Sequence, residues 1–169
     1  MNPDLEKLQP YPFEKLKTLL GQVTPPQALR PISLSIGEPK HPSPKIVLDA
    51  LQENMSKLSN YPTTKGIPEF RLAMAEWATR RFSLNASLCH EDNILPVNGT
   101  REAIFSFAQA VIDRTKDALV ISPNPFYQIY EGATYLAGAN LLLLPASEEN
   151  NFTPDYEKVT EKQWQQCQI

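Results

Sequence analysis

Residues 118–127 read ALVISPNPFY, an apolar run followed by a Ser-Pro-Asn-Pro loop and two aromatic residues. Such a run is typical of a strand buried on both faces of a sheet. Similar runs occur at residues 94–97 (ILPV) and 141–144 (LLLL), 23 or 24 residues away. Between the first two runs, apolar residues recur at helical spacing: Ile104, Phe107, Ala108, Val111 and Ile112. Strands that alternate with helices predict an α/β fold, with a mostly parallel sheet and flanking helices, although Pro96 removes one ladder donor.

Prolines punctuate residues 1–45, which we therefore expect to be mostly turns and extended chain. Within this stretch, residues 32–37 (ISLSIG) alternate apolar and polar side chains and predict a short strand. A helix is expected from Pro44 to about residue 58, and a second one from Pro68. Thr153-Pro154-Asp155 predicts another helix start. The helix that starts at Pro68 has an apolar face that we expect to be buried: Phe70, Ala73, Met74, Trp77 and Ala78.

The composition excludes several classes of protein. A formal net charge of -3 gives no basic excess for nucleic acid or an anionic membrane. No apolar run approaches the roughly 20 residues of a membrane span, and the N-terminus lacks the pattern of a signal peptide. Cys89 and Cys167 are isolated, without the spacing of zinc ligands, and we expect reduced thiols in a cytoplasmic protein. His41 and His90 have no nucleophile motif around them, so a hydrolase triad has no support.

Gly99, Thr100 and Arg101 follow the first apolar run and precede a helical segment. The free N–H groups at the start of a helix attract anions, and a glycine allows a ligand to approach the backbone closely. The Thr100 hydroxyl and the Arg101 guanidinium would add donors, so a phosphate group is the ligand that this pattern favours. The alternative is an ordinary turn between a strand and a helix. The pattern is neither a Walker loop nor GxGxxG, so nucleotide binding is not supported.

Three further residues are candidates because of their position. Tyr127, with Phe126, follows the second run, and loops after strands of α/β sheets commonly bind ligands. An aromatic side chain there could stack on a flat ring, or it could belong to the core. Tyr61 lies in a loop, where it could donate its hydroxyl or only pack. Gly37 follows an extended segment, where a turn alone would also explain a glycine.

Four motifs occur in a fixed order along the chain: SIGEP (35–39), YPTTKGIPEFRLAMAEW (61–77), NGTREAIF (98–105) and PNPFYQIYEG (123–132). Their order and spacing resemble the N-terminal part of class I/II aminotransferases of the pyridoxal-phosphate (PLP) fold type I. The amino-acid sequences of the four motifs are most similar to those of the bacterial N-succinyl-diaminopimelate aminotransferases. This resemblance implies the N-terminal part of a PLP-dependent transferase fold. Residues 1–45 would be the N-terminal arm and the start of the small domain, and residues 46–169 the first part of the large PLP-binding α/β domain.

The resemblance also implies roles for individual residues. Gly99, Thr100 and Arg101 match the turn that binds the phosphate of pyridoxal 5'-phosphate, and Tyr127 matches the aromatic residue that stacks on its ring. Tyr61 matches a tyrosine that reaches the partner's cofactor phosphate in a homodimer. Gly37 matches a glycine beside the substrate carboxylate. The implied substrates are small amino acids and 2-oxo acids, with glutamate as the amino donor.

The chain departs from the family in one respect. The lysine that bonds to the cofactor, the aspartate at its ring nitrogen and the arginine for the substrate carboxylate all lie further along the family's chain. Lys65 stands in YPTTKG and not in the family's lysine motif. We therefore expect an N-terminal portion of an aminotransferase that has no catalytic residue and no activity alone.

Two alternatives stay open from the sequence. The first is another fold-type I enzyme, such as an alanine or aspartate aminotransferase or a carbon–sulfur lyase. The second is a non-catalytic PLP-fold module that binds a ligand or a partner. The residues that recognise the substrate would separate the enzymes, and a basic helix-turn-helix ahead of the fold would favour a regulator.

Overall fold

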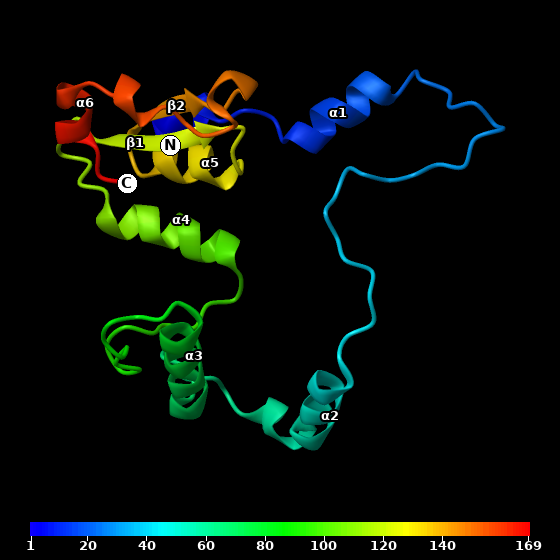
Figure 1. Ribbon diagram of the computed structural model, residues 1–169, viewed down its shortest axis with the longest axis vertical. Helices are drawn as coiled ribbons and strands as arrows, with labels where there is room; N and C mark the ends of the chain where they lie inside the picture. Colours follow the sequence, from blue (N-terminus) through cyan, green and yellow to red (C-terminus); the bar gives the residue numbers. More distant parts are fainter. The chain divides into compact units, whose positions relative to one another are not determined.

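The computed structural model describes residues 1–169, which form two compact units. The first unit comprises Met1–Leu19 and Val97–Ile169, and the second comprises Leu20–Pro96. Their helices and strands are labelled in Figure 1. None of the helices is both long enough and apolar enough to cross a membrane. The expected division near residue 45 concerns the domains of the family and stays a prediction.

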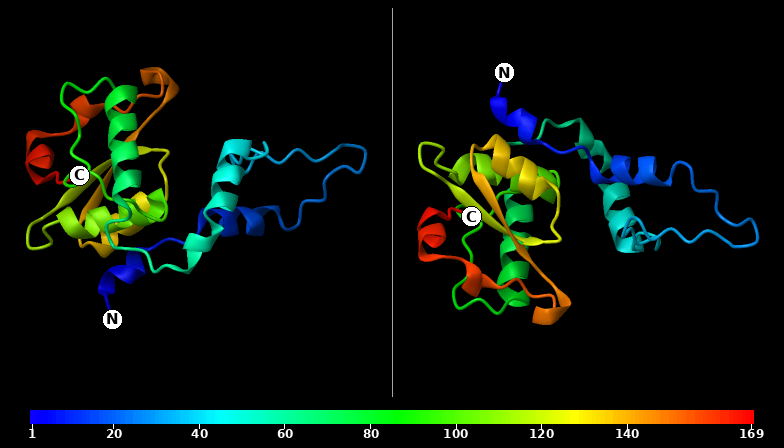
Figure 2. Two further views of the ribbon diagram at one scale, coloured as in Figure 1. Left: turned by 90° about the horizontal axis from the view of Figure 1, so that it is seen from below. Right: turned by 90° about the horizontal axis from the view of Figure 1, so that it is seen from above.

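The first unit contains a parallel sheet of two strands, β1 (Leu119–Asn124) and β2 (Asn140–Pro145). They pair in register from Leu119 opposite Asn140 to Asn124 opposite Pro145, and Figure 2 shows them side by side. The helix α5 (Ile129–Leu136) connects them, as a parallel pair requires. The apolar runs at 118–121 and 141–144 therefore form the parallel strands that the sequence predicts.

The core of this unit is built mainly from small side chains. The helix α4 (Thr100–Val111) packs against α5, and both contribute to a cluster with β1. Alanines let the helices approach each other and the sheet closely. Only part of the predicted apolar face of α4 is covered, because Phe107 and Val111 remain 58% and 42% exposed. The buried cluster consists of Ala108, Ile112, Ala118, Val120, Ala133, Ala137 and Ala139.

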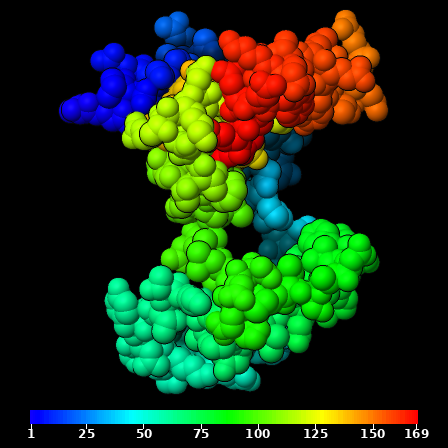
Figure 3. Space-filling model, turned by 90° about the vertical axis from the view of Figure 1, so that its left-hand side faces the viewer, coloured from blue at the N-terminus to red at the C-terminus, as the bar shows by residue number.

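The C-terminal residues add to the free edge of β1. Cys167 forms a parallel bridge with Leu119, and the Ile121 N–H donates to the Ile169 carbonyl at 2.9 Å. Figure 3 shows this end of the chain, in red, beside the yellow-green residues that lead into β1. The preceding helix α6 (Glu161–Gln166) begins with a capping box between Thr160 and Gln163. The predicted helix start at Asp155 is confirmed as the N-cap of a short 3-10 helix, η4 (Tyr156–Lys158).

Two predicted strands are wrong. Residues 94–97 and 32–37 are coil without ladder partners. Pro96 has no N–H to donate, and an apolar run becomes a strand only where another strand lies beside it. Residues 20–48 are exposed throughout, so the apolar side chains at 32–37 do not pack against any other part of the protein.

The predicted helices of the second unit form, with changed limits. The helix α2 (Lys45–Glu53) starts directly after Pro44 but ends before the predicted residue 58. The side chain of Asn54 donates to the Ala50 carbonyl at the end of α2, and the chain continues as the 3-10 helix η2 (Met55–Ser59). The helix α3 (Pro68–Arg81) starts at Pro68, as predicted.

The predicted buried face of α3 is wrong. Phe70 and Trp77 are 51% and 53% exposed, whereas Arg71 and Ala75 are 3% and 2% exposed. The cause is the Arg71 guanidinium, which donates to loop carbonyls and pairs with Glu91. These bonds place the face of α3 that contains Arg71 against the loop. The remaining elements are the 3-10 helices η1 (Pro3–Lys7) and η3 (Glu148–Asn150), and the helix α1 (Pro12–Leu20).

Candidate functional site

The start of α4 is an uncapped helix N-terminus. Gly99 is the N-cap residue and no side chain caps the helix, while the Ala103 N–H donates to the Gly99 carbonyl. The first N–H groups of a helix have no acceptor within the helix and carry partial positive charge. Thr100 and Arg101 are the first two helical residues, and both are exposed. The geometry at Gly99, Thr100 and Arg101 therefore suits an anion, and the binding of a phosphate there stays a prediction.

Gly99 has a backbone conformation that favours glycine, with φ 110° and ψ 148°. A Cβ atom at Gly99 would lie 2.9 Å from Oε2 of Glu102. The Glu102 carboxylate thus folds back toward the backbone at the start of its own helix. A carboxylate in this place is a local indication that the helix start attracts negative charge.

Arg101 and Tyr127 are 26 residues apart in the sequence and meet in the first unit. The Arg101 Nε donates to the Tyr127 hydroxyl at 2.8 Å, and the guanidinium carbon lies 5.6 Å from the ring centroid. The hydrogen bond to Tyr127, followed by Tyr11, raises the pKa of Arg101 above its ordinary value. Tyr130 packs its ring nearly perpendicular to that of Tyr127, with centroids 6.0 Å apart. Tyr127 is therefore both an aromatic surface and a partner of a permanent cation.

These two side chains line a pocket of about 250 Å³. The loop at the start of α5 forms one wall, and the N-terminal residues Leu8, Gln9 and Tyr11 form another. Sequence reasoning missed these N-terminal residues. The signal that could have drawn attention to them is an exposed tyrosine, Tyr11, between two prolines ahead of α1.

Tyr61 and Gly37 belong to the second unit. Tyr61 is 96% exposed, and a Cβ atom at Gly37 would meet no atom within 4 Å. Neither residue contacts a candidate residue of its own unit in a way that defines a site. The structure thus brings together Gly99, Thr100, Arg101 and Tyr127, while the roles expected for Tyr61 and Gly37 stay predictions.

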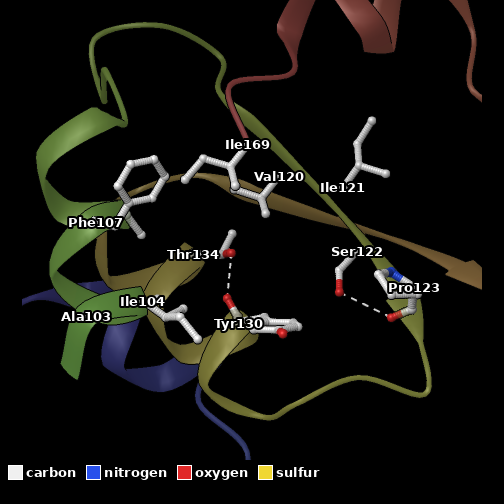
Figure 4. A pocket seen from close by; sticks show the side chains of 12 residues that line it. Ala103, Ile104, Phe107, Val120, Ile121, Ser122, Pro123, Tyr130, Thr134 and Ile169 are labelled. Carbon is white, nitrogen blue, oxygen red and sulfur yellow. Dashed lines mark hydrogen bonds between the residues drawn. The ribbon is translucent and has the colours of Figure 1, made fainter. Parts of the chain in front are cut away.

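A larger cavity of about 540 Å³ lies between α4, β1 and α5. Figure 4 shows Ile104 and Phe107 of α4 and Val120 of β1 around it, with Ile169 on one side. No charged side chain lines this cavity, and its Thr134 hydroxyl donates to the Tyr130 carbonyl within α5. The larger cavity therefore offers apolar surface, whereas the smaller pocket holds the groups suited to ligand chemistry.

Replacing Gly99 with alanine is expected to lower the free energy of unfolding of the first unit by about 1–3 kcal/mol, the typical cost of a strained backbone. The Cβ atom would also press on the Glu102 carboxylate. Urea unfolding of the chain, followed by circular dichroism, measures this change. Gly37→Ala is the matched control, because its Cβ atom meets nothing. Equal stability of the two variants would mean that Gly99 carries no strain.

Comparisons with known proteins assign the class. Residues 30–168 match the family model described as aminotransferase class I and II, so the chain belongs to this family and has its α/β fold. An aminotransferase from Neisseria meningitidis is similar in structure, with 41% identity and a TM-score of 0.88, over 99% of this chain and 42% of that one. Aminotransferase AspB from Helicobacter pylori has 37% identity and a TM-score of 0.83, over 95% and 41% of the two chains.

One curated relative is an LL-diaminopimelate aminotransferase from Dehalococcoides mccartyi, which is 35% identical over 157 residues, or 92% of this chain. This chain spans 39% of the length of that relative and 42% of the one from Maridesulfovibrio salexigens, which is 32% identical.

The family depends on pyridoxal 5'-phosphate. The residues at the start of α4 fit this group, since the helix start is uncapped and Arg101 supplies a charge beside it. Tyr127 supplies a half-exposed aromatic ring, and its hydroxyl accepts a hydrogen bond from Arg101.

Proposed function

We propose that this chain supplies the phosphate and ring contacts of a PLP-dependent aminotransferase. The observation that carries this proposal is the Arg101–Tyr127 pair beside the uncapped start of α4, in a chain that belongs to the class I and II family. A phosphorylated aromatic cofactor requires an anion site next to a flat apolar surface, and this pair offers both.

Each residue has a distinct task in this proposal. The first N–H groups of α4, the Thr100 hydroxyl and the Arg101 guanidinium hold the phosphate. The Tyr127 ring packs on the cofactor ring and keeps water from one face of it. A cofactor held by these residues would supply an electron sink for the substrate carbon that carries the amino group. Tyr61 would reach the phosphate on the partner subunit of a homodimer, and Gly37 would leave room for the substrate carboxylate.

We further propose that the whole enzyme is cytoplasmic and moves an amino group between glutamate or 2-oxoglutarate and a substrate of the diaminopimelate type, in lysine biosynthesis. Two substrates fit this class. The amino-acid sequences of the motifs favour N-succinyl-LL-diaminopimelate, whereas the curated relatives are named for LL-diaminopimelate itself. An assay of the full gene product with both substrates, and with alanine and aspartate, separates them. Preference for alanine or aspartate would contradict the proposal.

The 169-residue chain is expected to form no 2-oxoglutarate from glutamate above the rate of free pyridoxal phosphate. None of its lysines stands in the family's cofactor motif, so nothing can bond the cofactor for turnover. The measurement compares the purified chain with cofactor alone. A faster rate that Lys65→Ala abolishes would identify Lys65 as a catalytic lysine and overturn this expectation.

A further inference from the structure

The N-terminal segment Leu8–Tyr11 is fixed beside the Arg101–Tyr127 pocket. It follows η1, which packs on α5. Leu8 Cδ2 lies 4.0 Å from the position that a Cβ atom on Gly132 would take, and the Lys7 ammonium lies 5.9 Å from the centre of the Tyr135 ring. These contacts on two successive turns of α5 hold the segment along one wall of the pocket.

Tyr11 brings a second phenol to the pocket that Arg101 lines. The Arg101 Nε is already bonded to the Tyr127 hydroxyl, and the Tyr11 hydroxyl adds to the rise in the pKa of Arg101. A guanidinium has five N–H donors, so it can serve Tyr127, Tyr11 and a phosphate together. The Tyr11 ring packs on Phe13 with centroids 5.4 Å apart, which limits where its hydroxyl can go.

The position of the guanidinium has a consequence for stacking. It lies over the Tyr127 ring, 5.6 Å from the centroid. A flat ligand that stacks on this face requires the guanidinium to move off the ring. Tyr11 lines the same pocket, so its hydroxyl offers a second acceptor for a guanidinium that leaves the Tyr127 ring.

We propose that the segment Leu8–Tyr11 forms part of the ligand site, and that Tyr11 is a positioning residue that holds Arg101 for the phosphate of a phosphorylated aromatic ligand. This inference rests on the proposed function. It adds to the ligand site a residue outside the four motifs, and it assigns a role in ligand binding to the proline-rich N-terminal segment.

The test compares the dissociation constants of pyridoxal phosphate and of pyridoxal, measured by fluorescence with the full chain. Tyr11→Phe keeps the ring and removes the hydroxyl. We expect it to weaken binding of pyridoxal phosphate about fivefold, the usual size for one hydrogen bond, and to leave pyridoxal unchanged. Tyr156→Phe is the matched control, because Tyr156 is a half-exposed tyrosine outside the pocket, and its affinities should equal those of the wild type.

A double-mutant cycle with Arg101→Met tests whether Tyr11 acts through Arg101. If it does, Tyr11→Phe has no further effect on pyridoxal phosphate once Arg101 is gone. A purely structural role would weaken both ligands, with or without Arg101. If Arg101→Met lowers the affinity for pyridoxal phosphate and Tyr11→Phe does not, this inference fails and the proposed function stands. If the wild type does not prefer pyridoxal phosphate to pyridoxal, the proposed function fails.

Discussion

Replacing Arg101 with methionine is expected to weaken binding of pyridoxal phosphate by about tenfold or more, while binding of pyridoxal changes little. Methionine keeps the apolar stem of the side chain and removes its charge. The hydrogen bond to the Tyr127 hydroxyl is lost as well, but the Tyr127 ring remains for stacking. The effect should therefore depend on the phosphate, and titration of the chain with each ligand measures it.

Two variants sharpen this result. Arg101→Lys keeps a positive charge without the planar fork, so its affinity for pyridoxal phosphate should lie between those of the wild type and Arg101→Met. Arg114→Met removes an exposed arginine elsewhere in the first unit and controls for the change in net charge. If Arg114→Met weakens binding as much as Arg101→Met does, the loss comes from charge at a distance and not from a phosphate contact.

The sequence predicts those parts of the fold that have local causes. Proline at the first helical position places the start of α3 at Pro68, and the glycine N-cap places the start of α4 after Gly99. The apolar runs at 118–121 and 141–144 form strands because each lies beside the other. The same kind of run at residues 94–97 forms no strand, because strand pairing depends on a neighbouring strand, which a local run does not specify.

The candidate site shows the same limit. The sequence singles out Arg101 and Tyr127 separately, for a charge at a helix start and a ring after a strand. It cannot show that the two side chains bond to each other. They are 26 residues apart in the sequence, and the packing of α4 on α5 sets the distance between them. For Tyr11 the sequence offers only a tyrosine between two prolines, because the packing of η1 on α5 is what brings it to the pocket.

Replacing Arg71 with methionine is expected to lower the free energy of unfolding of the second unit by about 3 kcal/mol, the lower end of the cost of breaking a buried ion pair. The Arg71 side chain is 4% exposed, while that of Glu91 is 48% exposed and keeps part of its hydration. The guanidinium donates to both Glu91 carboxylate oxygens at 2.9 Å. It also donates to three loop carbonyls, those of Lys65, Gly66 and His90.

The hydrogen bonds that Arg71→Met removes include those that stabilise the loop containing Tyr61. The turn is closed by a hydrogen bond from the Gly66 N–H to the Thr63 carbonyl, and Arg71 Nη1 binds the Gly66 carbonyl from the other side at 2.8 Å. Methionine fills the space of the arginine stem but leaves the loop carbonyls without their donor. We therefore expect faster hydrogen exchange at the Gly66 amide in Arg71→Met than in the wild type.

The two tryptophans allow each unit to be followed alone, since Trp77 lies in α3 and Trp164 in α6. In a Trp164→Phe chain, the fluorescence of Trp77 reports urea unfolding of the second unit only. Arg80→Met is the matched control on the same helix, because Arg80 is exposed, and we expect it to change the free energy of unfolding by less than about 0.5 kcal/mol. If Arg71→Met unfolds at the same urea concentration as Arg80→Met, the buried guanidinium does not stabilise the unit. The inward turn of α3, with Phe70 and Trp77 left exposed, would then need another cause.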